Sequence, residues 1–106
     1  MIENLSPEHL LSRIQDSGSI KIIDVRTPAE FGEIHIQHAE NIPLDRLNAA
    51  TSNLNPGEDG FLYFICQSGG RSRKAVDSLK AAGATKIYHL DGGIIAWKNA
   101  GKPTEK

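Results

Sequence analysis

The sequence predicts an α/β domain in which a parallel sheet carries helices on both faces, a three-layer α/β/α arrangement. Three observations support this fold class. Segments with strand composition alternate with segments of helical periodicity, which is typical of parallel sheets. Residues 61–65, FLYFI, form a continuous apolar run, as expected for a strand buried on both faces. The length of 106 residues suits one compact domain, residues 1–106, with a single core.

The first half of the chain carries two helix starts and two strand signals. Ser6 and Pro7 suit the N-cap and first position of a helix that ends at Gly18. The β-branched run at residues 20–25 predicts a buried strand. Thr27 and Glu30 have the spacing of a capping box, so a second helix is predicted from there. AENIPL is a weaker strand signal, and a poorly defined helical stretch follows it up to Leu54.

The second half begins after a cluster of turn-forming residues at positions 55–60. The FLYFI strand is followed by apolar residues at helical spacing over residues 75–82, and Gly83 closes that helix. KIYHL, residues 86–90, predicts a further strand, and the DGG that follows it predicts a tight turn. IIAWKNAG predicts the last helix, with Trp97 in the core.

Composition excludes several classes of protein. The net charge of −1 gives no basic field for nucleic acid, and no apolar run approaches the roughly 20 residues of a membrane span. The N-terminal residues do not resemble a signal peptide, and one cysteine forms no internal disulfide, so we expect a cytoplasmic protein. We expect a monomer that acts on small molecules or a protein thiol, without a cofactor or a metal ion.

The single cysteine, Cys66, follows the FLYFI strand and precedes a loop that suits an anion. A thiol is a weak nucleophile until it ionises. Two glycines let the loop curl, and the amides at the start of the next helix stabilise negative charge. We therefore predict that Cys66 is the nucleophile, although a buried, inert cysteine is the alternative. The predicted substrate-binding loop comprises Gln67, Ser68, Gly69, Gly70, Arg71 and Ser72.

The spacing of this loop favours sulfur over phosphate chemistry. Cys66 and Arg71 are separated by four residues, whereas cysteine phosphatases use a similar cradle with five. A tighter ring of amides suits a single terminal sulfur better than a tetrahedral oxyanion. A phosphatase would also need a carboxylic acid to protonate its leaving group, and the sequence places none near the loop.

Asp24 and Arg26 are predicted to support the site from the end of the strand at residues 20–25. Asp24 either caps that strand end or hydrogen-bonds the cysteine loop. For Arg26, a surface ion pair with Glu30 or Glu33 is favoured over a position facing the cleft. Arg71 either contacts the substrate anion or, as we slightly favour, braces the loop by pairing with Asp24.

Three blocks of the sequence resemble the rhodanese family of sulfurtransferases. CQSGGRS resembles the family's active-site loop, IIDVRTPAEF its first signature and YHLDGGIIAWKNAGKP its C-terminal signature, in family order. The resemblance implies one α/β domain with a central five-stranded parallel sheet. It also implies that Cys66 takes a sulfane sulfur from a donor such as thiosulfate, forming a persulfide, and passes the outer sulfur to cyanide or a thiol.

The sequence departs from the family pattern at two places. The family commonly reads GHIPGAINIPL where this chain reads IHIQHAENIPL, so that Ile34, Gln37, His38 and Glu40 replace Gly, Pro, Gly and Ile. Gln67 stands where the family often has Arg, which removes a cation that would attract thiosulfate.

Two alternative functions remain open at this stage. One is a phosphatase or arsenate reductase built on the same scaffold. The other is a non-catalytic or sulfur-carrier module of a larger protein. Turnover with thiosulfate distinguishes the sulfurtransferase from both.

Overall fold

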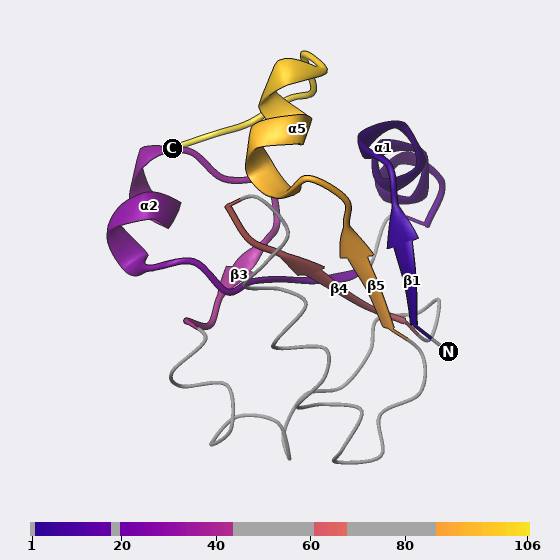
Figure 1. Cartoon of the computed structure of the whole chain (residues 1–106), viewed down its shortest axis with the longest axis horizontal. Helices are drawn as coiled ribbons and strands as arrows, with labels where there is room; N and C mark the ends of the chain where they lie inside the picture. The colour runs from indigo at the N-terminus through magenta and orange to yellow at the C-terminus, as the bar shows by residue number, and fades with distance from the viewer. Residues whose placement is uncertain (1, 18–19, 44–60, 68–86) are drawn as a thin grey trace.

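The computed structural model describes residues 2–17, 20–43, 61–67 and 87–106 (Figure 1). Five parallel strands form one sheet in the order β1-β5-β4-β2-β3, flanked by helices. This confirms the predicted α/β class and the five-stranded sheet. The strands are β1 (Ile2–Leu5), β2 (Lys21–Asp24), β3 (Glu40–Asn41), β4 (Leu62–Ile65) and β5 (Ile87–Leu90). The described helices are α1 (Pro7–Ser17), α2 (Pro28–Glu33) and α5 (Gly93–Asn99).

Strand β4 is the central strand, as its continuous apolar sequence predicts. All four of its residues are buried, and it pairs with β2 on one side and β5 on the other. In the β2–β4 register, Asp24 lies opposite Ile65. Because the strands are parallel, Asp24 and the residue after β4, Cys66, lie at the same edge of the sheet, where α/β proteins bind their ligands.

Strand β1 is the element that the sequence analysis missed. It pairs with β5, with Leu5 opposite Leu90, and forms one edge of the sheet. Its sequence, IENL, has polar residues in the middle and therefore gives neither an apolar run nor a clear alternation. The strand leads directly into α1, where the Ser6 hydroxyl accepts a hydrogen bond from the backbone N–H of His9 at 3.2 Å.

Helices α1 and α5 lie on one side of the sheet and share a hydrophobic core with it (Figure 1). Leu10 from α1 and Trp97 from α5 belong to one buried cluster with Tyr63, Ile65 and Leu90 of the sheet. The predicted core position of Trp97 is confirmed, and its indole Nε1 donates to the carbonyl oxygen of Pro103 at 2.7 Å. The core thereby fixes α5 against the carboxyl ends of β4 and β5.

The segment that departs from the family pattern forms a turn followed by the weakly predicted strand β3. The backbone N–H of Ala39 donates to the carbonyl oxygen of Ile36 at 3.0 Å, and His38 has a φ of 70°. That left-handed conformation suits glycine, the residue that the family commonly has there. The predicted helical stretch before Leu54, the turn at residues 55–60 and the helix over residues 75–83 lie outside the described residues.

Within the described part of the chain, none of the helices has the length and apolar character needed to cross a membrane.

Candidate active site

Cys66 directly follows β4, and its residue exposure is 0%. The strand brings it to the sheet edge where Asp24 ends β2. Gln67 comes next and is partly buried. The other predicted loop residues, Ser68, Gly69, Gly70, Arg71 and Ser72, lie outside the described residues, so their binding role stays a prediction.

The first turn of α5 forms hydrogen bonds with the backbone carbonyl groups of Cys66 and Gln67. The N–H of Ile94 donates to the carbonyl oxygen of Cys66 at 2.8 Å, and that of Ile95 donates to Gln67 at 3.2 Å. These N–H groups are among those that a helix start leaves without an internal partner. The helix start therefore fixes where the cysteine strand ends.

Gly93 makes this close approach possible. Its φ is 63°, and a Cβ built there would lie 2.4 Å from the carbonyl oxygen of Cys66 and 2.6 Å from that of Gln67. Sequence reasoning read the DGG as a tight turn but did not connect it to the site. The available signal was a Gly-Gly pair directly before a helix, a pattern that permits another backbone to approach closely.

Arg26 corrects one sequence-based expectation. Its guanidinium does not pair on the surface with the carboxylate of Glu30 or Glu33; it forms a buried ion pair with Asp24, with 2.8 Å between Nη2 and Oδ2. The Arg26 Nε donates to both carboxylate oxygens of Asp24, at 3.0 and 3.1 Å. Arg26 is buried because the chain turns back over the sheet edge immediately after β2. The negative charge of the Asp24 carboxylate compensates the positive charge of the buried guanidinium.

Asp24 also caps the end of β2, one of the two roles predicted for it. Its Oδ1 accepts a hydrogen bond from the backbone N–H of Arg26 at 3.0 Å, the local pattern of an Asx turn. Arg71 lies outside the described residues, so the expected brace between Asp24 and Arg71 stays a prediction.

The ion pair ties three elements together at this edge. The remaining guanidinium groups of Arg26 donate to the carbonyl oxygens of Glu30 at 3.3 Å and Ile34 at 2.6 Å, at the end of α2. The Asn41 amide of β3 donates to the carbonyl oxygens of Asp24 and Arg26, at 3.0 and 2.9 Å. Arg26 thus holds α2 and β3 against the end of β2.

Glu30 is a helix-capping residue, as predicted. Its Oε1 accepts hydrogen bonds from the backbone N–H of Thr27 at 3.0 Å and from the Thr27 hydroxyl at 3.1 Å. The Thr27 hydroxyl in turn accepts from the backbone N–H of Glu30 at 3.2 Å. This capping box fixes the start of α2 close to the buried Arg26.

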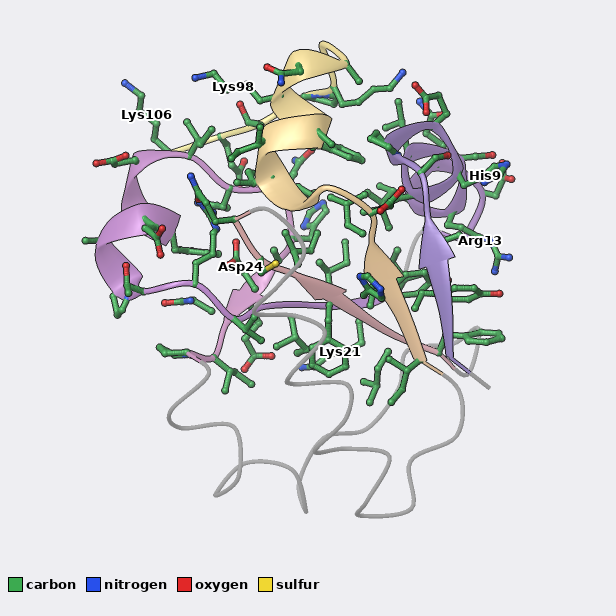
Figure 2. The ribbon with its side chains drawn as sticks, viewed as in Figure 1. His9, Arg13, Lys21, Asp24, Lys98 and Lys106 are labelled. Carbon is green, nitrogen blue, oxygen red and sulfur yellow. The ribbon has the colours of Figure 1, made fainter. Side chains whose placement is uncertain are left out.

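A cavity of about 340 Å³ lies between α2 and α5, and Gln67 forms part of its wall. Its size is within the range of small-molecule sites, roughly 300–1,000 Å³. Sequence reasoning missed two residues that line it, Lys98 and Asn99 of α5, because only the packing of α5 against the end of β4 places them there. In Figure 2, Lys98 lies on the outer part of α5, away from the sheet.

Comparisons with known proteins agree with this architecture. A protein of uncharacterised function from Synechocystis is 42% identical over 96 residues, 91% of this chain and 52% of that protein, so the chain spans about half of that relative. A protein named sulfurtransferase from Allochromatium vinosum is 33% identical over 103 residues, 97% of this chain and 94% of that protein. The crystal structure of a rhodanese-related protein from Thermoplasma volcanium matches with a TM-score of 0.84 at 29% identity, covering 97% of both chains. A family model described as Rhodanese-like domain matches residues 6–100, and the chain belongs to this family.

Proposed function

We propose that this chain is a sulfurtransferase that moves a sulfane sulfur from thiosulfate, or another persulfide donor, to a thiophilic acceptor through a persulfide on Cys66. Family membership and the sulfurtransferase relative support the general class of reaction. The choice of donor and the covalent intermediate are inferred from the cysteine and its loop.

The reaction divides into two balanced steps. In the first, the Cys66 thiolate attacks the outer sulfur of thiosulfate, the S–S bond of thiosulfate breaks and sulfite leaves with the bonding electron pair. In the second, cyanide or a thiolate attacks the outer sulfur of the persulfide, and Cys66 leaves as a thiolate. No net oxidation occurs, so the cycle needs no redox cofactor.

One observation carries this proposal: the only cysteine of the chain is buried directly after the central strand, with its carbonyl oxygen held by α5. A persulfide on a lone cysteine cannot be resolved by a second cysteine of the same chain. The sulfur must therefore leave to an external acceptor. The outer sulfur lies about 2.05 Å beyond the buried Sγ, which brings the reactive atom nearer to an incoming acceptor.

The loop from Gln67 to Ser72 is the proposed donor site. Its backbone amides would stabilise the negative charge of the thiolate and of the incoming thiosulfate. Gln67 brings no positive charge next to Cys66, so we expect weaker attraction for thiosulfate than in relatives that have Arg there.

Steady-state turnover tests the proposal. We expect the wild-type chain to produce thiocyanate from thiosulfate and cyanide, and we expect Cys66→Ser to produce none above background. Hydrolysis of an aryl phosphate is measured on the same samples, and circular dichroism verifies that the variant is folded. Efficient phosphate hydrolysis without thiocyanate formation would favour the phosphatase alternative. Wild-type protein that loads no sulfur and turns over neither substrate would favour a non-catalytic module.

A further inference from the structure

Residues 102–106 form a strap that leads from the end of α5 to the end of α2 (Figure 1). The strap is attached to α5 at two places. The backbone N–H of Lys102 donates to the carbonyl oxygen of Trp97 at 3.2 Å, and the carbonyl oxygen of Pro103 accepts from the Trp97 indole at 2.7 Å. Because Trp97 is fully buried, the start of the strap is fixed by the core.

The far end of the strap is bound to the segment that follows α2. The backbone N–H groups of His35 and Glu105 each donate to the other's carbonyl oxygen at 2.8 Å, in an antiparallel bridge. The residue before His35, Ile34, is held through its carbonyl oxygen by the buried Arg26. The strap therefore ties α5, which contacts the Cys66 backbone, to the segment that Arg26 fixes at the sheet edge.

The imidazole of His35 lies between two oxygen acceptors. Its Nδ1 is 2.9 Å from the carbonyl oxygen of Phe31, and its Nε2 is 3.3 Å from Oε1 of Glu105. The ring stacks on Phe31, with 3.9 Å between the ring centroids and 5° between the planes, and the His35 side chain is only 12% exposed. Stacking and burial hold the ring in the orientation that makes both contacts.

Only the charged ring satisfies both oxygens. A neutral imidazole carries one N–H, whereas imidazolium carries two. In the neutral ring that donates its Nδ1–H to Phe31, the lone pair of Nε2 faces the carboxylate of Glu105, and that contact is repulsive. Protonation converts the same contact into an ion pair. The carbonyl groups at the end of α2, which include that of Phe31, also favour a cation at this position.

We propose that protonation of His35 closes the strap onto the end of α2 and that loss of the proton loosens it, so that His35 positions α2 and α5 in a pH-dependent way. The consequence for the site rests on the proposed function, whereas strap closure does not. Residues of both helices line the cavity beside Gln67, so their separation determines access to the residue next to Cys66. His35 is a positioning residue, which acts through the strap and takes no part in the bonds that form and break.

Glu105 is the charged group that meets the ring. The other charged residues of α2, the strap and the turn that binds Ile34 are Glu30, Glu33, Lys102, Lys106 and Arg26. The Glu30 carboxylate is engaged in the capping box, and Arg26 is compensated by Asp24. Within the described ranges, none of these residues forms an ion pair with His35. The contact with Glu105 is therefore complete at acidic pH and is lost as the pH rises and His35 releases its proton.

Hydrogen exchange of the isotope-labelled full chain tests strap closure. Protection factors of the amides at positions 35 and 105, each relative to an unstructured peptide at the same pH, are measured by NMR. The range runs from about pH 5.5 to about pH 8.5, where histidine side chains lose their proton and carboxylates stay ionised. The Val25 amide, which donates to the carbonyl oxygen of Ile65 inside the sheet, reports global opening in the same samples.

Two variants remove the two halves of the contact. His35→Gln keeps a hydrogen-bond donor but cannot take up a proton, and Glu105→Gln removes the negative charge while keeping the backbone bridge. The controls are His9→Gln and Glu8→Gln, which change exposed residues of α1. In wild type we expect the protection at positions 35 and 105 to be about five-fold higher at the acidic limit, as for one half-exposed charge contact. Both variants should lose this pH dependence, and both controls should keep it.

Sulfur transfer tests the positioning role. At each pH, kcat/KM for thiocyanate formation by wild type is divided by that of His35→Gln, so that the ionisation of Cys66, which is common to both proteins, cancels. We expect a ratio of roughly two to five at the acidic limit, where the strap is closed only in wild type, and a ratio near one at the basic limit. The same ratio for His9→Gln should stay near one throughout.

The two measurements separate the possible failures. Protection that does not depend on pH in wild type, that changes in parallel with Val25, or that keeps its pH dependence in both variants would overturn strap closure by His35. A flat activity ratio together with pH-dependent protection would overturn the positioning role and leave the proposed function intact. Absence of sulfur transfer in wild type would instead contradict the proposed function and with it the positioning role, while the exchange data still decide whether His35 closes the strap.

Discussion

Arg26 and Asp24 form an ion pair at the carboxyl end of β2 in which only 2% and 1% of the two side chains are exposed. The guanidinium of Arg26 also donates to carbonyl oxygens at the end of α2, and Asn41 links the same backbone to β3. The pair therefore joins three elements at the sheet edge where Cys66 lies. We propose that the pair positions the site, because these contacts within the protein account for the burial of both side chains.

Removing Arg26 should lower the stability of the domain strongly. Arg26→Met leaves the Asp24 carboxylate buried without its counter-charge, and we expect the free energy of unfolding to fall by about 3–5 kcal/mol. Chemical denaturation followed by circular dichroism measures the change. Lys21→Met is the matched control, because it breaks an ion pair with Glu40 whose side chains are 35% and 53% exposed, for an expected loss under about 1 kcal/mol. Equal losses in the two variants would show that the Asp24–Arg26 pair is not a structural brace.

The sequence alone could not identify the partner of Arg26. Three carboxylates lie within seven residues of it, and helical spacing makes Glu30 and Glu33 plausible partners. The choice of Asp24 depends on the backbone turning at the end of β2, which buries the guanidinium next to the nearest carboxylate. The turn itself is a local Asx turn at Asp24, but the burial of the guanidinium depends on the packing of α2 and β3 around it, which no local pattern predicts.

Gly93 should be intolerant of any side chain. In Gly93→Ala the new Cβ would approach the carbonyl oxygens of Cys66 and Gln67 to within 2.6 Å or less, so α5 must move away from the cysteine strand. We expect sulfur transfer to fall by at least about ten-fold, which corresponds to about 1.4 kcal/mol in the barrier. The rate of thiocyanate formation at saturating thiosulfate measures this loss of sulfur transfer.

Gly101→Ala separates this steric effect from backbone strain. Gly101 has a φ of 72°, similar to that of Gly93, but a Cβ there would meet nothing within 4 Å. Both variants therefore carry the strain of a left-handed alanine, about 1 kcal/mol, and only Gly93→Ala displaces the site backbone. If the two variants lose activity equally, the close approach to the Cys66 carbonyl oxygen does not explain why glycine is needed at position 93.

His38→Gly should make the protein more stable. His38 adopts a φ of 70°, which is strained for any residue with a Cβ, and glycine relieves that strain by about 1 kcal/mol. Thermal unfolding should show a melting temperature higher by roughly 4 °C. His38→Ala removes the imidazole but keeps the Cβ, so it should give no comparable gain. If the melting temperature rises equally in both variants, the stabilisation comes from loss of the imidazole and not from relief of backbone strain.

The sequence predicted much of the architecture because its elements carry strong local signals. The capping box at Thr27 and Glu30 and the apolar run of β4 both appear in the structure as expected. Strand β1 was missed because its sequence mixes polar and apolar residues and its pairing partner, β5, is more than 80 residues away. Long-range pairing of this kind leaves no local trace.

The candidate site was predictable only in part, for the same reason. Cys66 is identified by its place after a buried strand and before two glycines. The contacts that α5 makes to its backbone, and the cavity lined by Glu33 and Lys98, depend on elements that are separated by 25 residues or more in the sequence and meet only in the fold.

The central claim is that Cys66 carries the transferred sulfur, and intact-mass spectrometry after thiosulfate treatment tests it most directly. Wild-type protein is incubated with thiosulfate, freed of excess reagent and measured before and after addition of cyanide. We predict a gain of about 32 Da, located on Cys66 by peptide mapping, that disappears when cyanide is added. Folded Cys66→Ser should show no gain. A wild-type protein that turns over thiosulfate without this adduct, or a Cys66→Ser variant that still gains and transfers sulfur, would contradict the account.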